Sequence, residues 1–117
     1  MRVSNGPASR ERRRRRLELA KGFRGSRSKL FRQATEAVDR AQRLATTHRK
    51  DRKREFRALW ITRINLAVRA EGMTYSRFME GVIKAGIEIN RKMLSEMAIQ
   101  DVEGFKKIVE AARKALV

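Results

Sequence analysis

Apolar residues recur at helical spacing along almost the whole chain, and no segment alternates β-branched and polar residues as a strand would. This pattern predicts an all-α protein. The only proline, Pro7, lies beside Gly6 in an irregular opening. Ser9 is the expected N-cap of a first helix over about residues 10–21, and Gly22 is expected to end it.

The longest predicted helix runs from Ser26 to Glu71, because this stretch contains neither glycine nor proline and Gly72 follows it. At 1.5 Å per residue, its roughly 45 residues would extend over about 70 Å. Its first part carries a narrow apolar seam formed by Leu30, Ala34, Ala37, Ala41 and Leu44. Residues 46–55 contain no large apolar side chain, so we expect this polar middle part to need a partner along its length.

A broader apolar face follows, formed by Phe56, Leu59, Trp60, Ile64, Ala67 and Val68. Beyond it, Thr74, Asn90 and Asp101 are the expected N-caps of three short helices. The residues expected on their inner sides are Phe78, Met79, Val82 and Ile83, then Met93, Leu94 and Met97, and finally Phe105, Ile108, Val109 and Ala112. Because the connections are only a few residues long, the pattern favours a small antiparallel helical bundle.

Charge and hydrophobicity divide the chain in two. Of its 117 residues, 30 are Lys or Arg and 13 are Asp or Glu, which gives a net charge of +17. Residues 1–59 hold 20 of these basic and 6 of these acidic residues but only 11 large apolar ones, whereas residues 60–117 hold 10, 7 and 23. We therefore predict a basic helical extension over 1–59, bent near residues 22–25, and a small globular domain over 60–117. So large an excess of positive charge favours a polyanionic partner such as nucleic acid.

The sequence excludes most enzyme and metal-site chemistry. It contains no cysteine, and its single histidine, His48, is surrounded by cations with no second ligand at metal-binding spacing. Motifs of serine hydrolases, zinc proteases and dinucleotide-binding enzymes are missing from it. We therefore predict no catalytic residue, no metal and no cofactor. No apolar run approaches the roughly 20 residues of a membrane helix, so no membrane partner is expected.

Two clusters of cations are the strongest candidate binding residues. The first consists of Arg12, Arg13, Arg14, Arg15 and Arg16, which place guanidinium groups all around the first predicted helix. The second lies in residues 48–57, with two acids and six cations: Arg49, Lys50, Arg52, Lys53, Arg54 and Arg57. Guanidinium groups match phosphate in a bidentate manner, so nucleic-acid contact is favoured over a targeting signal, an unengaged solubilising tail or a solvated helix with internal ion pairs.

The aromatic residues leave several interpretations open. Trp60, with Phe56 and Ile64 one helical turn away on either side, is interpreted as a core residue rather than a base-stacking platform. Tyr75 fits a core position and an RNA contact equally well. Phe23 would either insert into a nucleic-acid fold or fix the bend. Candidate RNA contacts partly off the apolar face are Arg63, Asn65 and Arg69.

Residues 53–65, KREFRALWITRIN, resemble the signature K-R-x-F-R-x-L-W-I-x-R-I-N of the bacterial large-subunit ribosomal protein L-twenty family. Shorter matches in the same order and spacing occur at residues 19–23, 26–29 and 75–78 with Gly81, and at 90–92 with Leu94. The resemblance covers essentially the whole chain. It implies a long basic helical extension that penetrates the RNA of the large ribosomal subunit, and a small all-helical domain on that RNA in the cytoplasmic ribosome.

The resemblance also implies which residues contact large-subunit ribosomal RNA: Lys21, Gly22, Arg27, Lys29, Arg52, Lys53, Arg54, Arg57, Arg63, Asn65, Tyr75, Ser76, Arg91 and Lys92. The predicted contact set further includes Arg24 and Arg32. Arg24 stands where the family usually has an aromatic residue, so a stacking contact is not carried over to that position. Neighbouring large-subunit proteins are implied as partners, together with a role in subunit assembly and, in some members, repression of their own messenger RNA.

Other classes of protein fit the residues less well. A DNA-packaging or basic-zipper protein would need a long dimer seam, which Gly72, Gly81 and Gly86 would interrupt. An RNA-modifying enzyme would need reactive residues that the sequence does not offer. A repressor of messenger RNA would use the same RNA-binding surface, so that alternative stays open. The sequence therefore predicts a structural, RNA-binding constituent of the large ribosomal subunit, without catalysis.

Overall fold

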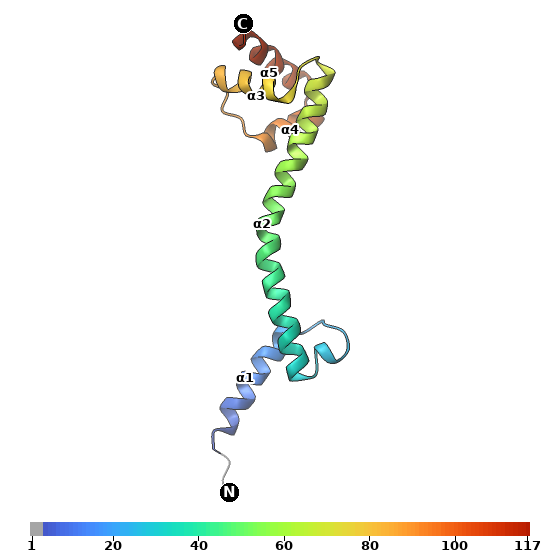
Figure 1. Cartoon of the computed structure of the whole chain (residues 1–117), viewed down its shortest axis with the longest axis vertical. Helices are drawn as coiled ribbons and strands as arrows, with labels where there is room; N and C mark the ends of the chain where they lie inside the picture. Colours follow the sequence, from blue (N-terminus) through green and yellow to red (C-terminus); the bar gives the residue numbers. More distant parts are fainter. Residues whose placement is uncertain (1–3) are drawn as a thin grey trace. The chain divides into compact units, whose positions relative to one another are not determined.

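A computed structural model describes residues 4–117, and over that range the chain is helical with no strand (Figure 1). Its elements are α1 (Gly6–Leu19), the short 3₁₀ helix η1 (Gly25–Arg27), α2 (Phe31–Ala70), α3 (Tyr75–Lys84), α4 (Arg91–Gln100) and α5 (Val102–Ala115). The predicted all-α class is confirmed. Residues 1–3, the start of the predicted extension, lie outside the described part of the chain.

The chain divides into two compact units, a first one that ends at Lys50 and a second one over Asp51–Val117. Helix α2 is continuous through the division and contributes residues to both units. The boundary predicted from composition, between Leu59 and Trp60, stays a prediction.

Helix α1 begins at Gly6 and not at residue 10 as predicted. Its N-cap is Asn5, whose φ of 63° lies in the left-handed region that asparagine tolerates better than most residues. Pro7 suits the first turn, because its φ is already helical and no N–H partner is needed there. The predicted cap at Ser9 is therefore wrong: Ser9 lies inside the helix, and its amide donates to the Asn5 carbonyl at 3.3 Å.

A loop with two left-handed glycines connects α1 to α2. Gly22 has a φ of 90° and Gly25 a φ of 65°, both in the region that glycine enters at little cost. The Ser28 hydroxyl donates to the Gly25 carbonyl at 3.0 Å, a local bond that competes with helix formation. Helix α2 accordingly starts at Phe31, later than the predicted Ser26, while the predicted bend is confirmed.

The first unit has a very small core. Ala20, Ala34 and Val38 are buried, and Leu17 and Phe23 pack against them. Phe23 therefore fixes the bend between α1 and α2. The remainder of the predicted alanine-rich seam is not a packing face: Leu30, Ala41 and Leu44 are exposed, and only Ala37 is half-buried. Residues 39–50 of α2 are all exposed, and for residues 46–50 this agrees with their predicted polar pattern.

The second unit has a larger core, to which the last turns of α2 and all three short helices contribute. Its buried members are Ile64, Val68, Phe78, Val82, Leu94, Phe105, Val109 and Ala112. The rings of Phe78 and Phe105 lie 5.7 Å apart at the centre of this cluster. Helices α3 and α5 approach so closely that a Cβ atom at Gly81 would lie 2.4 Å from the carbonyl oxygen of Ala112. Glycine is therefore required at this crossing.

The N-caps of the last two helices are confirmed. The Asn90 side chain accepts from the amide of Met93 at 2.9 Å, and the Asp101 side chain accepts from the amide of Gly104 at 2.9 Å. Thr74 precedes α3 as predicted, but its side chain makes no capping hydrogen bond.

Some predicted inward positions of the short helices face solvent instead. Ile83 is 74% exposed and Met93 is 56% exposed, although Val82 and Leu94 beside them are buried. In each case the neighbouring residue supplies the buried side chain, because the helices are short and bury only a narrow strip. The predicted inward orientation of Ile83 and Met93 is therefore wrong, whereas that of Val82 and Leu94 is confirmed.

The interpretation of Trp60 as a core residue is also wrong. Trp60 is only partly buried and lies outside the hydrophobic cluster, with its ring 6.2 Å from that of Phe56. Phe56 and Leu59 are exposed as well. The apolar face of α2 extends further toward the N-terminus than the short helices reach, so only its end, from Ile64 onward, is buried.

Candidate nucleic-acid interface

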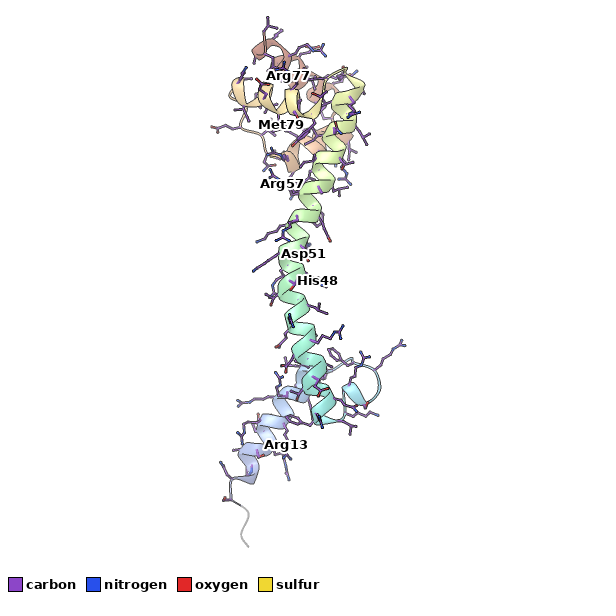
Figure 2. The ribbon with its side chains drawn as sticks, viewed as in Figure 1. Arg13, His48, Asp51, Arg57, Arg77 and Met79 are labelled. Atoms are coloured by element: carbon purple, nitrogen blue, oxygen red, sulfur yellow. The ribbon has the colours of Figure 1, made fainter. Side chains whose placement is uncertain are left out.

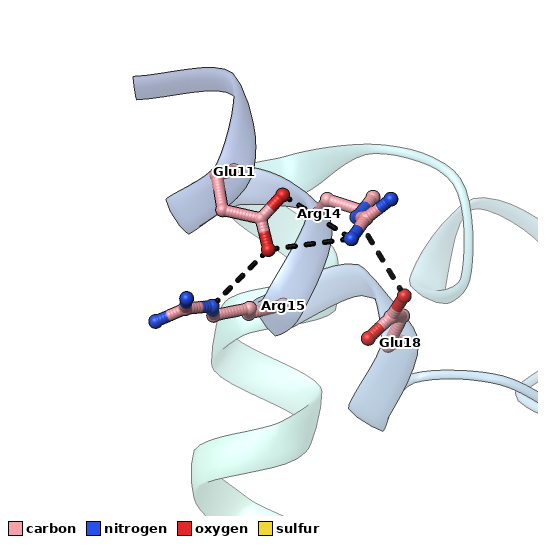
Figure 3. A network of polar contacts seen from close by, with 4 residues as sticks. All are labelled: Glu11, Arg14, Arg15 and Glu18. Carbon is pink, nitrogen blue, oxygen red and sulfur yellow. Dashed lines mark hydrogen bonds and ion pairs between the residues drawn. The ribbon is translucent and has the colours of Figure 1, made fainter. Parts of the chain in front are cut away.

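The five consecutive arginines of α1 differ in how far they are neutralised. Arg14 contacts Glu11 at 3.3 Å and Glu18 at 3.8 Å, and Arg15 contacts Glu11 at 3.3 Å, so three arginine–carboxylate contacts form one small network (Figure 3). The side chains of Arg14 and Arg15 are still 66% and 73% exposed. Exposed ion pairs of this kind contribute little stability and are readily exchanged for other anions.

The other three arginines of this run are Arg12, Arg13 and Arg16. Arg16 pairs with Asp39 of α2 within the first unit and thereby ties the two helices together. Arg12 and Arg13 are exposed, and neither forms an ion pair within residues 4–117. The run thus offers two uncompensated guanidinium groups and two weakly compensated ones to an external anion, whereas Arg16 has a structural role.

The loop between α1 and α2 carries the next group of predicted contacts, Lys21, Gly22, Arg24, Arg27 and Lys29, all of which are exposed. Arg32, at the start of α2, pairs with Glu36 at 3.6 Å. An open groove of about 1040 Å³ lies between this loop and α2, and Arg24 and Arg27 line it together with Arg40.

Arg40 is absent from the predicted contact set, although it lies in this groove. The signal that could have identified it is its helical spacing from Ala37 and Leu44, which line the same groove one turn before and one turn after it. Arg40 is not singled out from sequence, because the loop that completes the groove cannot be placed from sequence.

The second cationic cluster lies on a part of α2 that buries almost nothing; Figure 2 labels His48, Asp51 and Arg57 along it. Arg54 contacts Asp51 at 3.2 Å, and the guanidinium group of Arg52 lies over the ring of Phe56 at 5.7 Å. The other cations of the cluster, Arg49, Lys50, Lys53 and Arg57, have no ion-pair partner among the described residues. The two acids of the segment therefore do not balance its six cations.

The second unit brings together two predicted contacts that are 16 positions apart in the sequence. The Nε of Arg91, at the start of α4, donates to the hydroxyl of Tyr75, at the start of α3, at 2.8 Å. Tyr75 is half-buried against the core, so its ring is a core contact and its hydroxyl a polar one. The two nitrogen atoms at the tip of the Arg91 guanidinium group are left for an external acceptor.

A second pair of predicted contacts lies on α2. The Nε of Arg69 donates to the Oδ1 of Asn65 at 3.2 Å, so the two side chains support each other one helical turn apart. The remaining predicted contacts of this unit, Arg63, Ser76 and Lys92, are exposed and form no side-chain hydrogen bond or ion pair within residues 4–117.

Other cations of the second unit have ion-pair or hydrogen-bond partners within the chain. Arg77 and Lys84 contact Glu80 at 3.1 and 3.0 Å. The hydrogen bond from Lys84 is the larger cause, and that from Arg77 the next, of a lowered pKa of the Glu80 carboxyl. Arg113 of α5 donates to the Glu71 carbonyl at 2.7 Å. Residues 60–117 carry only a small net charge because their 7 acidic residues nearly balance their 10 basic ones.

Metal-ligand clusters and membrane-spanning helices are absent from the described residues. No group of three or more His, Asp or Glu side chains there could hold a metal ion. No helix in residues 4–117 is both long and apolar enough to cross a membrane.

Comparison with known proteins gives a consistent result. A family model described as ribosomal protein L20 matches residues 2–108. The large ribosomal subunit protein bL20 of Alkaliphilus metalliredigens (strain QYMF) is 56% identical over 115 residues, which cover 98% of this chain and 97% of the relative. The protein of the same name from Methylacidiphilum infernorum (isolate V4) is 57% identical over 113 residues, covering 97% and 94%. That of Geobacter metallireducens (strain ATCC 53774 / DSM 7210 / GS-15) is 54% identical over 112 residues, covering 96% of each.

Proposed function

This chain belongs to the ribosomal protein L20 family, and on that premise we propose that it binds the RNA of the large ribosomal subunit and supports assembly of that subunit. The family resemblance noted in residues 53–65 is thereby confirmed. The relatives are ribosomal proteins and not enzymes, in agreement with the predicted lack of catalysis.

One observation carries the proposal: the exposed cations lie on α1 and on the middle part of α2, two segments that bury almost no surface of their own. A helix with such a polar segment is marginal in water unless a partner covers it. Phosphate groups supply both the missing negative charge and the missing contacts, and structured RNA presents phosphates on several sides at once.

The mechanism is electrostatic. Arginine and lysine side chains of the extension, residues 1–59, bind phosphates of separate RNA segments and release their counterions, so segments that repel one another can come together during assembly. The globular domain, residues 60–117, adds a smaller set of contacts around Asn65, Tyr75 and Arg91. The site residues predicted from sequence remain the proposed contacts, with the ribosome as the place of action and neighbouring large-subunit proteins as further partners.

Competition binding tests the proposal. The full chain should keep a saturable complex with large-subunit ribosomal RNA at about 150 mM salt in the presence of excess duplex DNA and transfer RNA. Complete displacement by these competitors would reduce the interaction to unspecific polyanion binding and contradict the proposal. The chain's own messenger RNA, added as a further competitor, tests the self-repression that the family resemblance implies.

A charge-matched pair of variants sharpens this experiment. Changing Arg12 and Arg13 to Gln removes two uncompensated cations of the extension, and should reduce the slope of log affinity against log salt by about 0.7–0.9 for each lost phosphate contact. Changing Lys107 and Lys114 of α5 to Gln removes the same charge from exposed positions outside the proposed contact set. This control should leave the slope almost unchanged. Equal effects of the two variants would show that only net charge matters.

A further inference from the structure

The groove between the α1–α2 loop and α2 is a separate feature of the first unit. On the loop side Phe23, Arg24, Ser26 and Arg27 line it. On the α2 side its lining consists of Gln33, Glu36, Ala37, Arg40, Ala41 and Leu44. We propose that this groove binds an unstacked nucleotide of the RNA, with the base on an apolar floor and the flanking phosphates on Arg24, Arg27 and Arg40. This inference rests on the proposed function and gives it a specific subsite.

The floor of the groove offers apolar surface that the unit itself does not cover. Ala37, Ala41 and Leu44 follow one another along α2 at helical spacing, and Leu44 is 43% exposed. Phe23 borders them from the loop side, while also packing on the small core. The face of a nucleobase is apolar and flat, so it can cover such a strip, as stacked bases do on other single-strand binding surfaces.

The charges around the floor favour a phosphodiester over other occupants. Arg24, Arg27 and Arg40 form no ion pair within residues 4–117. The one acid of the lining, Glu36, is already paired with Arg32 at 3.6 Å. Three uncompensated guanidinium groups around one apolar strip fit an anionic chain that also carries flat apolar groups. A nucleotide has both properties, whereas an acidic peptide presents its charges on flexible side chains.

The groove is already formed in the chain alone. Gly22 and Gly25 fix the course of the loop through their left-handed backbones, and the Ser28 hydroxyl closes its turn on the Gly25 carbonyl. Phe23 anchors the loop to the core of the unit. Binding therefore needs little reordering of the protein, which preserves affinity. The volume of about 1040 Å³ accommodates an unstacked base with its sugar and flanking phosphates.

Filling the groove without changing its charge tests this inference. In the full chain, Ala37→Leu combined with Ala41→Leu would occupy the floor with aliphatic side chains that also favour helix formation. The matched control combines Gln42→Leu with Thr46→Leu, two exposed positions of α2 that do not line the groove. Affinity for large-subunit ribosomal RNA would be measured for both at several salt concentrations, with thermal unfolding as a check on folding.

The groove variant should bind about tenfold or more weakly, which corresponds to losing one stacked base, with an unchanged salt slope. The control should stay within about twofold of the original chain. Equal affinity of the two leucine variants would overturn the inference but leave the proposed function intact, since that function depends on binding by the original chain against competitors.

A second variant changes a charged residue that lines the groove and leaves the apolar floor intact, so it avoids any effect of the floor substitutions on folding. Arg40→Gln should lower the salt slope by about 0.7–0.9, because it removes one phosphate contact. Lys107→Gln, at an exposed position of α5 outside the extension and the proposed contact set, is its control. A slope that drops equally for both variants, or for neither, would overturn the assignment of Arg40 to a phosphate in the groove.

Discussion

The two compact units of this chain are stabilised in different ways. The second unit buries eight residues in one cluster, including Phe78 and Phe105. The first unit buries Ala20, Ala34 and Val38 and exposes most of its arginines. A few buried methyl groups contribute far less to stability than a pair of buried aromatic rings. The first unit is therefore expected to be the less stable of the two when no RNA is bound.

This contrast explains why both regions are helical although only one has a substantial core. In the second unit, tertiary packing selects the helices. In the first, the helices carry exposed cations, and in the proposed function bound phosphates take the role that buried side chains have elsewhere. Stability and RNA affinity should accordingly respond to different substitutions.

The largest expected effect on stability comes from the centre of the larger core. Phe105→Ala should lower the free energy of unfolding by about 3–5 kcal/mol, because Phe105 is only 2% exposed and stacks near Phe78. Denaturant unfolding followed by circular dichroism would measure this loss. Phe31→Ala, at a 43% exposed position of the first unit, is the control and should cost much less. Equal losses would show that the first unit has a core of similar strength.

The next effect concerns the close crossing of α3 and α5. Gly81→Ala would place a Cβ atom 2.4 Å from the Ala112 carbonyl oxygen, so the helices must separate. We expect a loss of about 1–3 kcal/mol in the free energy of unfolding, the usual range for overpacking. Gly6→Ala, where no atom lies within 4 Å of the added Cβ, serves as control in the same denaturant series. An unchanged midpoint for Gly81→Ala would contradict the close approach of the helices.

A smaller effect is expected from the hydrogen bond between Arg91 and Tyr75 in the second unit, which bears on both stability and RNA affinity. Tyr75→Phe removes the hydroxyl that accepts from Arg91 but keeps the ring on the core, so we expect about 1 kcal/mol of destabilisation. Affinity for large-subunit ribosomal RNA should fall as well, because Arg91 is no longer held in place. Arg91→Gln should cause a comparable loss of affinity. If Tyr75→Phe binds RNA like the original chain while Arg91→Gln does not, Tyr75 has no positioning role.

The sequence predicted the helical class, the bend and the two side-chain caps, because glycine, asparagine and aspartate determine local backbone geometry directly. Asn90 and Asp101 cap their helices as expected. The start of α1 was not predictable from Ser9, since Gly6 and Pro7 fit a first helical turn as well as an irregular opening. Local sequence signals indicate the positions at which a helix can begin, but they do not determine which of these positions is used.

Tertiary packing accounts for the other differences. Trp60 has the spacing of a core residue, but how far the short helices extend along α2 depends on contacts that one sequence does not reveal. The same limit applies to Arg40, which lines a groove only because the α1–α2 loop lies opposite it. The cationic clusters, in contrast, were visible from composition alone, because phosphate contact requires charge and exposure rather than one particular fold.

The smallest expected effect concerns the surface of the second unit, where Lys84 and Arg77 lower the pKa of Glu80 below its usual 4.5. Since the pKa is lower in the folded state, the resulting stabilisation is complete above about pH 4.5 and is lost as the pH falls through the lowered value. The Glu80 side chain is 41% exposed, so solvent screens this contribution. Glu80→Gln should thus lower the melting temperature slightly at neutral pH and not at all in strong acid. Glu88→Gln, an exposed change without an ion-pair partner in the described chain, is the control. A difference between Glu80→Gln and the original chain that persists unchanged in strong acid would contradict an ionic origin.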